Sequence, residues 1–184
     1  MEITDRDLFL RYAIPCGDVL VKRGDLRQET LDRVRGKVIK KQEIKEDLET
    51  IFPIAVRMCR LLAKKSGKEI IDPEVIRDYF WHEHAKAVEW RAEIYPDLPR
   101  EECLIYPARV VKLGKNPLVE TPLGEKQAKT DFVQRLNKDD WVILHYDYIV
   151  EKITREEAEK LLEEQSRISV AEDSKANISP ETNL

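Results

Sequence analysis

The sequence predicts an α+β protein, with a helical region over residues 1–100 followed by a small antiparallel OB-like β-barrel and a C-terminal helix over residues 101–165. Three observations support this class. Apolar residues recur every three or four positions in the first hundred residues, the repeat then shortens to two, and prolines crowd the stretch between the two patterns. Residues 166–184 are polar and aperiodic, so we expect a disordered tail there.

The composition is that of a globular chain with a well-solvated surface. Of the 184 residues 42% are hydrophobic and 37% are charged, and 32 basic side chains nearly balance 36 acidic ones. This balance gives no global signature of a nucleic-acid or membrane binder. No segment approaches the roughly 20 apolar residues of a membrane helix, and the first residues lack a signal-peptide pattern. Cys16, Cys59 and Cys103 are widely spaced without a CxxC pair, which indicates a reducing, cytoplasmic setting.

Three helical segments are predicted in the first hundred residues. Asp25 is expected to cap the first, which buries apolar residues as far as Val38. Pro53 should split the second segment, and Gly67 should end it. Asp72, followed by proline, should cap the third. The "YPDLPREE" stretch that follows is the expected domain boundary.

Short strand candidates follow this boundary. They are "ARVVKL" at 108–113, "PLVETPL" at 117–123, "KQAKTDFV" at 126–133 and "DWVILHYDYIVEKI" at 140–153. Four or five short strands in about 50 residues suit a small barrel, because closure removes exposed edges. The "LGEK" stretch is expected to form a hairpin turn, with Gly124 free to take a positive φ. Thr154 and Glu157 form a capping box that should start the last helix.

Two segments of this second region resemble a known family. "CLIYPARVV" at 103–111 is similar to the start of the HypC/HupF hydrogenase-maturation chaperones, which typically read Met-Cys-Leu-Ala-Ile-Pro-(Gly/Ala)-(Lys/Arg)-Val-Val. "DDWVILHYDYIVEKITREEAEKLLEE" at 139–164 resembles the closing pattern of the same family. The resemblance therefore covers residues 103–164 and leaves the helical region unmatched. In the family the cysteine follows the initiator methionine, whereas here Glu102 and a hundred further residues precede it.

The resemblance implies a non-catalytic assembly chaperone for NiFe-hydrogenase maturation. The implied partners are a HypD-like maturase and the hydrogenase large-subunit precursor. The resemblance implies no intrinsic cofactor, but a transient iron–cyanide–carbonyl unit as cargo.

The essential cysteine of the family maps onto Cys103, and the histidine of its late strand maps onto His145. These two residues are the candidate partner-binding and iron-binding pair, since thiolate and imidazole both suit iron. Pro107 and Arg109 belong to the same motif, and Arg109 is a candidate source of the positive charge that favours a thiolate. We expect Cys103 to be presented outward at the rim of the barrel, with the His145 imidazole on a common surface.

An alternative is an OB-like interaction or nucleic-acid-binding module that has lost the carrier role. Residues 103–153 hold eight basic and seven acidic side chains, which is a weak field for phosphate binding. No Ser-His-Asp order, phosphate loop or paired-carboxylate motif stands out, so we do not expect an enzyme.

The remaining cysteines and histidines give weaker indications. His82 and His84 of "WHEHAK" lie about 200° apart on a helix and cannot bind one ion, so no metal site is expected there. We expect His84 to make a hydrogen bond in the core or at an interface, and His82 to be solvated. Cys59 should serve packing alone, and Cys16, in a predicted loop, gives no indication of function. "RYAIPCGDVLVKRG" at 11–24 echoes the family motif, as a coincidence or a decayed copy.

Overall fold

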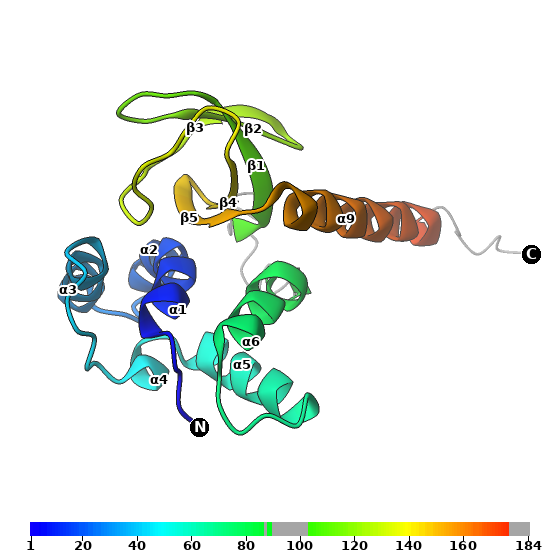
Figure 1. Ribbon diagram of the computed structural model, residues 1–184. Helices are drawn as coiled ribbons and strands as arrows, with labels where there is room; N and C mark the ends of the chain where they lie inside the picture. The colour runs from blue at the N-terminus through cyan, green and yellow to red at the C-terminus, as the bar shows by residue number, and fades with distance from the viewer. Residues whose placement is uncertain (87, 90–102, 177–184) are drawn as a thin grey trace, which may run out of the picture.

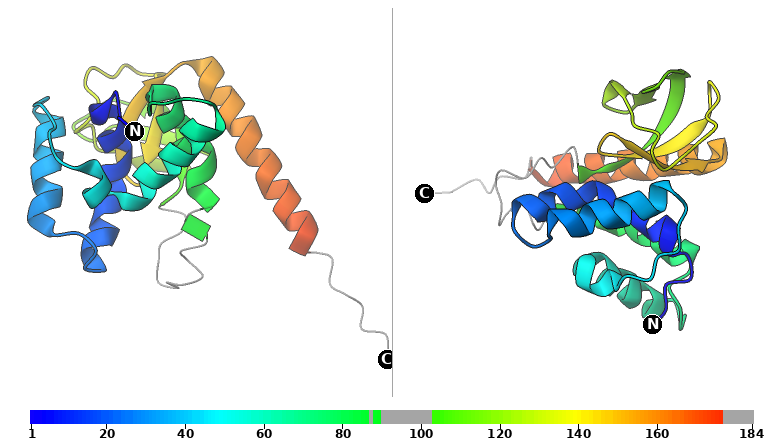
Figure 2. Two further views of the ribbon diagram at one scale, coloured as in Figure 1. Left: turned by 90° about the horizontal axis from the view of Figure 1, so that it is seen from below. Right: turned by 90° about the vertical axis from the view of Figure 1, so that its left-hand side faces the viewer.

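The computed structural model describes residues 1–86, 88–89 and 103–176 of the chain. A layer of helices lies beneath a five-stranded antiparallel sheet, and one long helix extends away from the sheet (Figures 1 and 2). The predicted fold class is confirmed, except that the sheet does not close into a barrel. No helix in the described part of the chain has the length and apolar character needed to span a lipid bilayer.

Helical residues 84–86 and 88–89 end the described part of the helical layer. Before them lie eight short elements. They are α1 (Arg6–Ala13), the 3-10 turn η1 (Ile14–Cys16), α2 (Gly17–Lys22), α3 (Gln28–Ile39), α4 (Leu48–Ile51), α5 (Pro53–Lys65), α6 (Pro73–Asp78) and the π-helical turn η2 (Tyr79–Glu83). The split before Pro53 is confirmed, because Phe52 has φ −128° and ψ 62° between α4 and α5. Gly67, with φ +69°, ends α5, and the Asp72 carboxylate caps α6 by accepting from the Val75 N–H at 2.9 Å.

The predicted cap at Asp25 is wrong. The helix starts at Gln28, and its first turn has no side-chain cap. The backbone N–H of Asp25 instead donates to the Leu20 carbonyl at 2.9 Å, which closes the end of α2, and the Asp25 carboxylate pairs with Arg23 at 2.7 Å. The residue is therefore used to end one helix and cannot begin the next.

The strands lie in the order β3-β2-β1-β4-β5. Their bounds are β1 (Ile105–Lys112), β2 (Leu118–Thr121), β3 (Gly124–Gln127), β4 (Trp141–His145) and β5 (Tyr148–Ile153). Closure into a barrel would need a ladder of hydrogen bonds between the edge strands β3 and β5. The chain leaves β3 after Gln127, and the described residues then join the two edges through a single bridge between Lys129 and Tyr148. The two ends of the sheet thus meet at a single residue. The predicted barrel is corrected to an open sheet.

Two turns set the register of the sheet. Gly124 pairs with Thr121 and has φ +110°, so the turn lies at residues 122–123, two residues earlier than the centre of the predicted "LGEK" turn at 123–126. The predicted long strand at 140–153 is a hairpin, in which His145 pairs with Tyr148 and Tyr146 takes φ +55° in the turn.

The last helix, α9, spans Arg155–Ala176 and begins with the predicted capping box. The Glu157 carboxylate accepts from the Thr154 N–H at 2.7 Å, and the Thr154 hydroxyl accepts from the Glu157 N–H at 3.2 Å. The helix continues through residues 166–176, where the sequence predicted a disordered tail. Residues 177–184 lie outside the described residues, as does the whole of the predicted boundary at 95–102.

One hydrophobic core joins the sheet to the helical layer. Ile105, Ile143 and Val150 of the sheet belong to the same buried cluster as Phe9 and Phe80 of the helices. A second, smaller cluster lies within the sheet region itself and includes Val110, Val119 and Val142. The two predicted regions are therefore packed on each other through a continuous apolar interface.

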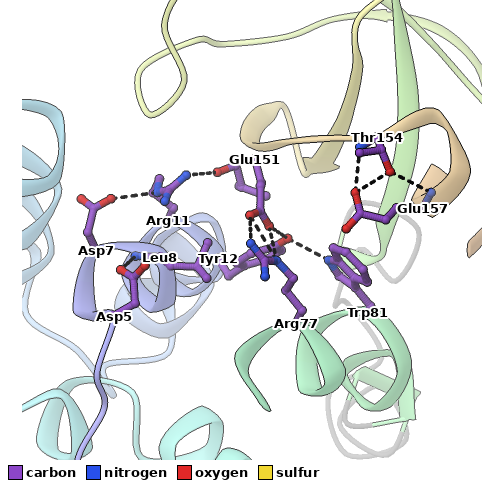
Figure 3. A network of polar contacts seen from close by, with 11 residues as sticks. Asp5, Asp7, Leu8, Arg11, Tyr12, Arg77, Trp81, Glu151, Thr154 and Glu157 are labelled. Carbon is purple, nitrogen blue, oxygen red and sulfur yellow. Dashed lines mark hydrogen bonds and ion pairs between the residues drawn. The ribbon is translucent and has the colours of Figure 1, made fainter. Parts of the chain in front are cut away.

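A buried polar network crosses this interface (Figure 3). The carboxylate of Glu151 on β5 is 8% exposed and accepts hydrogen bonds from the Tyr12 hydroxyl at 2.7 Å and from the Arg77 guanidinium at 2.5 Å. Trp81 donates its indole N–H to the Tyr12 hydroxyl at 2.7 Å. Burial, followed by the charge of Glu151, raises the pKa of Tyr12 well above its ordinary value, so its hydroxyl remains a donor. Arg11 also donates to the Val150 carbonyl at 3.1 Å.

We predict that Glu151→Ala lowers the free energy of unfolding by about 2–4 kcal/mol, because it leaves Arg77 and Tyr12 at a buried interface without their acceptor. The measurement is urea unfolding followed by tryptophan fluorescence. Glu120→Ala is the matched control, since Glu120 pairs with Arg109 on the exposed side of the sheet at 2.8 Å and should leave the urea midpoint unchanged. Equal midpoint shifts for the two variants would contradict the assignment of Glu151 as an interface residue.

Candidate functional site

A cavity of about 410 Å³ lies between the helical layer and the start of the sheet. Cys16, His84, Cys103 and Tyr146 contribute polar groups to its wall, and much of the remaining wall is apolar, including Phe80. The family-like cysteine therefore opens onto a space that the helical region helps to build. Sequence reasoning did not foresee this space, because its walls come from segments far apart in the chain.

Cys103 lies just before β1 and is 3% exposed. Its sulfur contacts the hydroxyl of Tyr146, in the β4–β5 turn, at 2.5 Å. The predicted outward presentation at a barrel rim is therefore wrong, because the β4–β5 turn and the helical layer cover the thiol. Cys103 instead faces the cavity, and a ligand would reach its sulfur from there.

His145 ends β4 and is fully buried against α1. Its Nδ1 lies 2.9 Å from the Tyr12 carbonyl oxygen, and a carbonyl can only accept, so Nδ1 bears the proton. In the neutral ring Nε2 then has a lone pair, and this atom lies 3.2 Å from the Cys16 sulfur. Burial lowers the pKa of His145 to about 4, although hydrogen bonds with the backbone of Tyr12 and Cys103 act in the opposite direction. The imidazole is thus neutral at physiological pH.

The predicted pair of Cys103 and His145 is brought together only in part. The backbone of Cys103 lies beside the His145 ring, but the two side chains have different partners. The sulfur of Cys103 contacts Tyr146, whereas the free lone pair of His145 faces Cys16. Their shared role in iron binding stays a prediction.

Cys16 reaches this position through the turn between α1 and α2. Pro15 lies in the η1 turn, and Gly17 begins α2 where it packs closely on α3. A Cβ on Gly17 would lie 2.3 Å from a methyl carbon of Leu31, so a larger residue would push α2 and Cys16 away from this position.

His84 completes a cluster that the sequence analysis missed. His84 is 7% exposed, which agrees with its predicted place in the core or at an interface. Its Nε2 lies 3.6 Å from the Cys16 sulfur. One ligand atom from each of Cys16, His84 and His145 lies within 4.8 Å of the other two. The helical period did place His84 on the buried face. No spacing in the sequence, however, relates residues 16, 84 and 145 to one another.

The other candidate residues fall outside this cluster. Pro107 lies in β1 opposite Ile143, where only β4 flanks the strand, because the pairing of β1 with β2 begins at Arg109. The missing N–H of the proline therefore costs no ladder bond. Arg109 is held by Glu120 and Asp139, each at 2.8 Å. It lies within β1, four residues after Ile105, and its suggested charge effect on the Cys103 thiol stays a prediction.

His82 and Cys59 behave as the sequence predicts. The His82 side chain is 37% exposed and lies 3.3 Å from the Glu164 carboxylate, away from the cluster. Cys59 is fully buried in α5, and burial raises the pKa of its thiol to about 12. Its role is packing.

A comparison with protein-family models matches residues 103–164 to the HupF/HypC family. The match covers about a third of the chain and confirms the resemblance of the C-terminal region. It supports a role as a hydrogenase-maturation chaperone in general, and chaperone activity of this family is consistent with a protein that is not an enzyme. Comparisons with curated proteins and with solved structures gave no match.

The low pKa of His145 predicts a stability that falls with acid in the metal-free protein. Between pH 6.5 and about 4 the unfolded chain binds a proton that the folded chain excludes, so the free energy of unfolding should fall by up to about 1.4 kcal/mol for each pH unit lost. Urea unfolding in EDTA at pH 7, 6 and 5 measures this slope. His145→Gln should reduce the slope by up to the contribution of one bound proton. An unchanged slope would contradict the assignment of the low pKa to His145.

The cavity also predicts an order of thiol reactivity. Cys16 and Cys103 face the cavity and should react with iodoacetamide at pH 8 in the folded protein. Cys59 should remain unmodified, because it is buried and at a pKa of about 12 has roughly one thiolate in 10⁴ molecules. Peptide mass spectrometry over a time course gives the order. Modification of Cys59 before Cys103 would contradict the placement of the cavity.

Proposed function

We propose that the protein is a HypC-like chaperone that assists maturation of the NiFe-hydrogenase large subunit. In this proposal it binds a HypD-like maturase and the large-subunit precursor, and Cys103 binds the iron of an iron–cyanide–carbonyl unit in transit. The match of residues 103–164 to the HupF/HypC family is the observation that favours this function.

The surroundings of Cys103 agree with a carrier role. The thiol opens onto a cavity of about 410 Å³, near the lower end of the volumes that hold small ligands, and an iron ion with a few diatomic ligands is smaller than such ligands. The lining is mainly apolar, which suits uncharged carbonyl groups.

The internal position of Cys103 changes how cargo would be exchanged. A free terminal thiol can extend into a partner, whereas here residues on both sides tether the sulfur and the Tyr146 hydroxyl contacts it. In our proposal, a partner therefore docks over the cavity and exchanges cargo there. The helical region would then form part of the docking surface, since every lining residue except Cys103 and Tyr146 belongs to it.

The proposal predicts the cargo of the purified protein. After anaerobic co-expression with a HypD-like maturase, the full chain should contain iron and show infrared bands of cyanide and carbonyl. Cys103→Ala should lose both while retaining the circular dichroism of the wild type. Cys59→Ala is the control that should retain both. Undiminished bands in Cys103→Ala would contradict the carrier role, and capture of the maturase without any bands would support the alternative of an interaction module.

A further inference from the structure

We propose that Cys16, His84 and His145 bind one divalent transition-metal ion between the helical layer and the sheet. Two of these ligands come from the helical region and one from β4, so neither part of the chain holds the site alone. The inference does not depend on Cys103 and therefore stands apart from the proposed function, although the two sites share the same cavity.

The distances are close to those of a metal site. In tetrahedral coordination with metal–sulfur bonds of about 2.3 Å and metal–nitrogen bonds of about 2.0 Å, the sulfur and nitrogen ligands lie about 3.5 Å apart. The Cys16 sulfur lies 3.2 Å from Nε2 of His145 and 3.6 Å from Nε2 of His84. The three ligand atoms lie within 4.8 Å of one another. Two nitrogens around one tetrahedral ion lie about 3.3 Å apart, so the two imidazoles would approach each other by up to about 1.5 Å on binding.

His145 is already oriented as a ligand. Metal-binding histidines usually donate their second ring N–H to a carbonyl or carboxylate, which fixes the tautomer and the ring orientation. The Tyr12 carbonyl accepts from Nδ1 of His145 at 2.9 Å and leaves the Nε2 lone pair directed at Cys16. The neutral ring can therefore bind a metal without first losing a proton.

The donor set indicates the class of ion. One thiolate and two imidazoles favour borderline ions such as Zn²⁺, Fe²⁺ or Co²⁺ over Mg²⁺ or Ca²⁺, which prefer oxygen. Three protein ligands leave a fourth tetrahedral position. Cys16 and His84 both line the cavity, so that position would face the space into which Cys103 also opens. A bound ion would thus keep an exchangeable ligand.

A hydrogen-bonded cluster without metal is the competing interpretation. In that interpretation the Cys16 thiol donates to Nε2 of His145, and the His84 ring in its Nε2–H tautomer donates to the Cys16 sulfur. A metal ion would accept electron pairs from all three atoms at once.

The test is titration of the reduced, EDTA-stripped full chain with CoCl₂ under anaerobic conditions. We expect one equivalent to bind, with a thiolate-to-cobalt charge-transfer band and the intense visible bands of tetrahedral Co²⁺. Cys16→Ala should remove the charge-transfer band and weaken Co²⁺ binding by about 100-fold or more. His84→Gln should weaken binding while keeping the band, and circular dichroism should show that both variants are folded.

Cys59→Ala and Cys103→Ala are the matched controls and should retain the band and the affinity. A band that persists in Cys16→Ala would overturn the inference. Loss of the charge-transfer band in Cys103→Ala together with its retention in Cys16→Ala would also overturn the inference. That result would place the ion at Cys103 and would leave the proposed function standing. Retained Co²⁺ affinity in His84→Gln would likewise overturn the three-ligand site.

Discussion

Tyr12 is the residue through which the helical layer and the sheet hold each other in place. Its hydroxyl donates to Glu151 on β5 at 2.7 Å, and its backbone carbonyl accepts from His145 on β4 at 2.9 Å. Tyr12 lies near the end of α1, just before the chain enters η1. The contact of its carbonyl with Nδ1 aims the His145 ring at Cys16.

This packing of the helical layer on the sheet explains why the candidate site draws residues from both halves of the chain. The family-like region supplies Cys103, His145 and Tyr146, but the wall of the cavity comes mostly from the helices. A free-standing domain of residues 103–164 would expose the His145 side of the sheet, which is apolar and buried here against the helical layer. The helices thus convert one face of an open sheet into an enclosed site, with Cys16 and His84 as their contribution.

Local patterns made much of the fold predictable, and long-range packing decided the rest. Pro53, the Asp72 cap and the capping box at Thr154 act within a few residues, so the sequence was enough to predict them. Closure of a barrel depends on whether distant strands pair, and β3 is too short and leaves the edge too early to do so. Resemblance identified Cys103, but its burial beneath Tyr146 depends on a turn 43 residues away. Residues 16, 84 and 145 come together only through tertiary packing, so no spacing in the sequence signals that they are neighbours.

Atoms from the helical layer and from the sheet meet around one proposed metal site. X-ray absorption at the zinc edge of the Zn²⁺-loaded, full-length Cys103→Ala protein tests this claim directly. We expect one sulfur neighbour at about 2.3 Å, nitrogen neighbours at about 2.0 Å and the outer-shell scattering of two imidazole rings. A shell of oxygen and nitrogen without sulfur, or scattering from a single imidazole, would contradict this expectation.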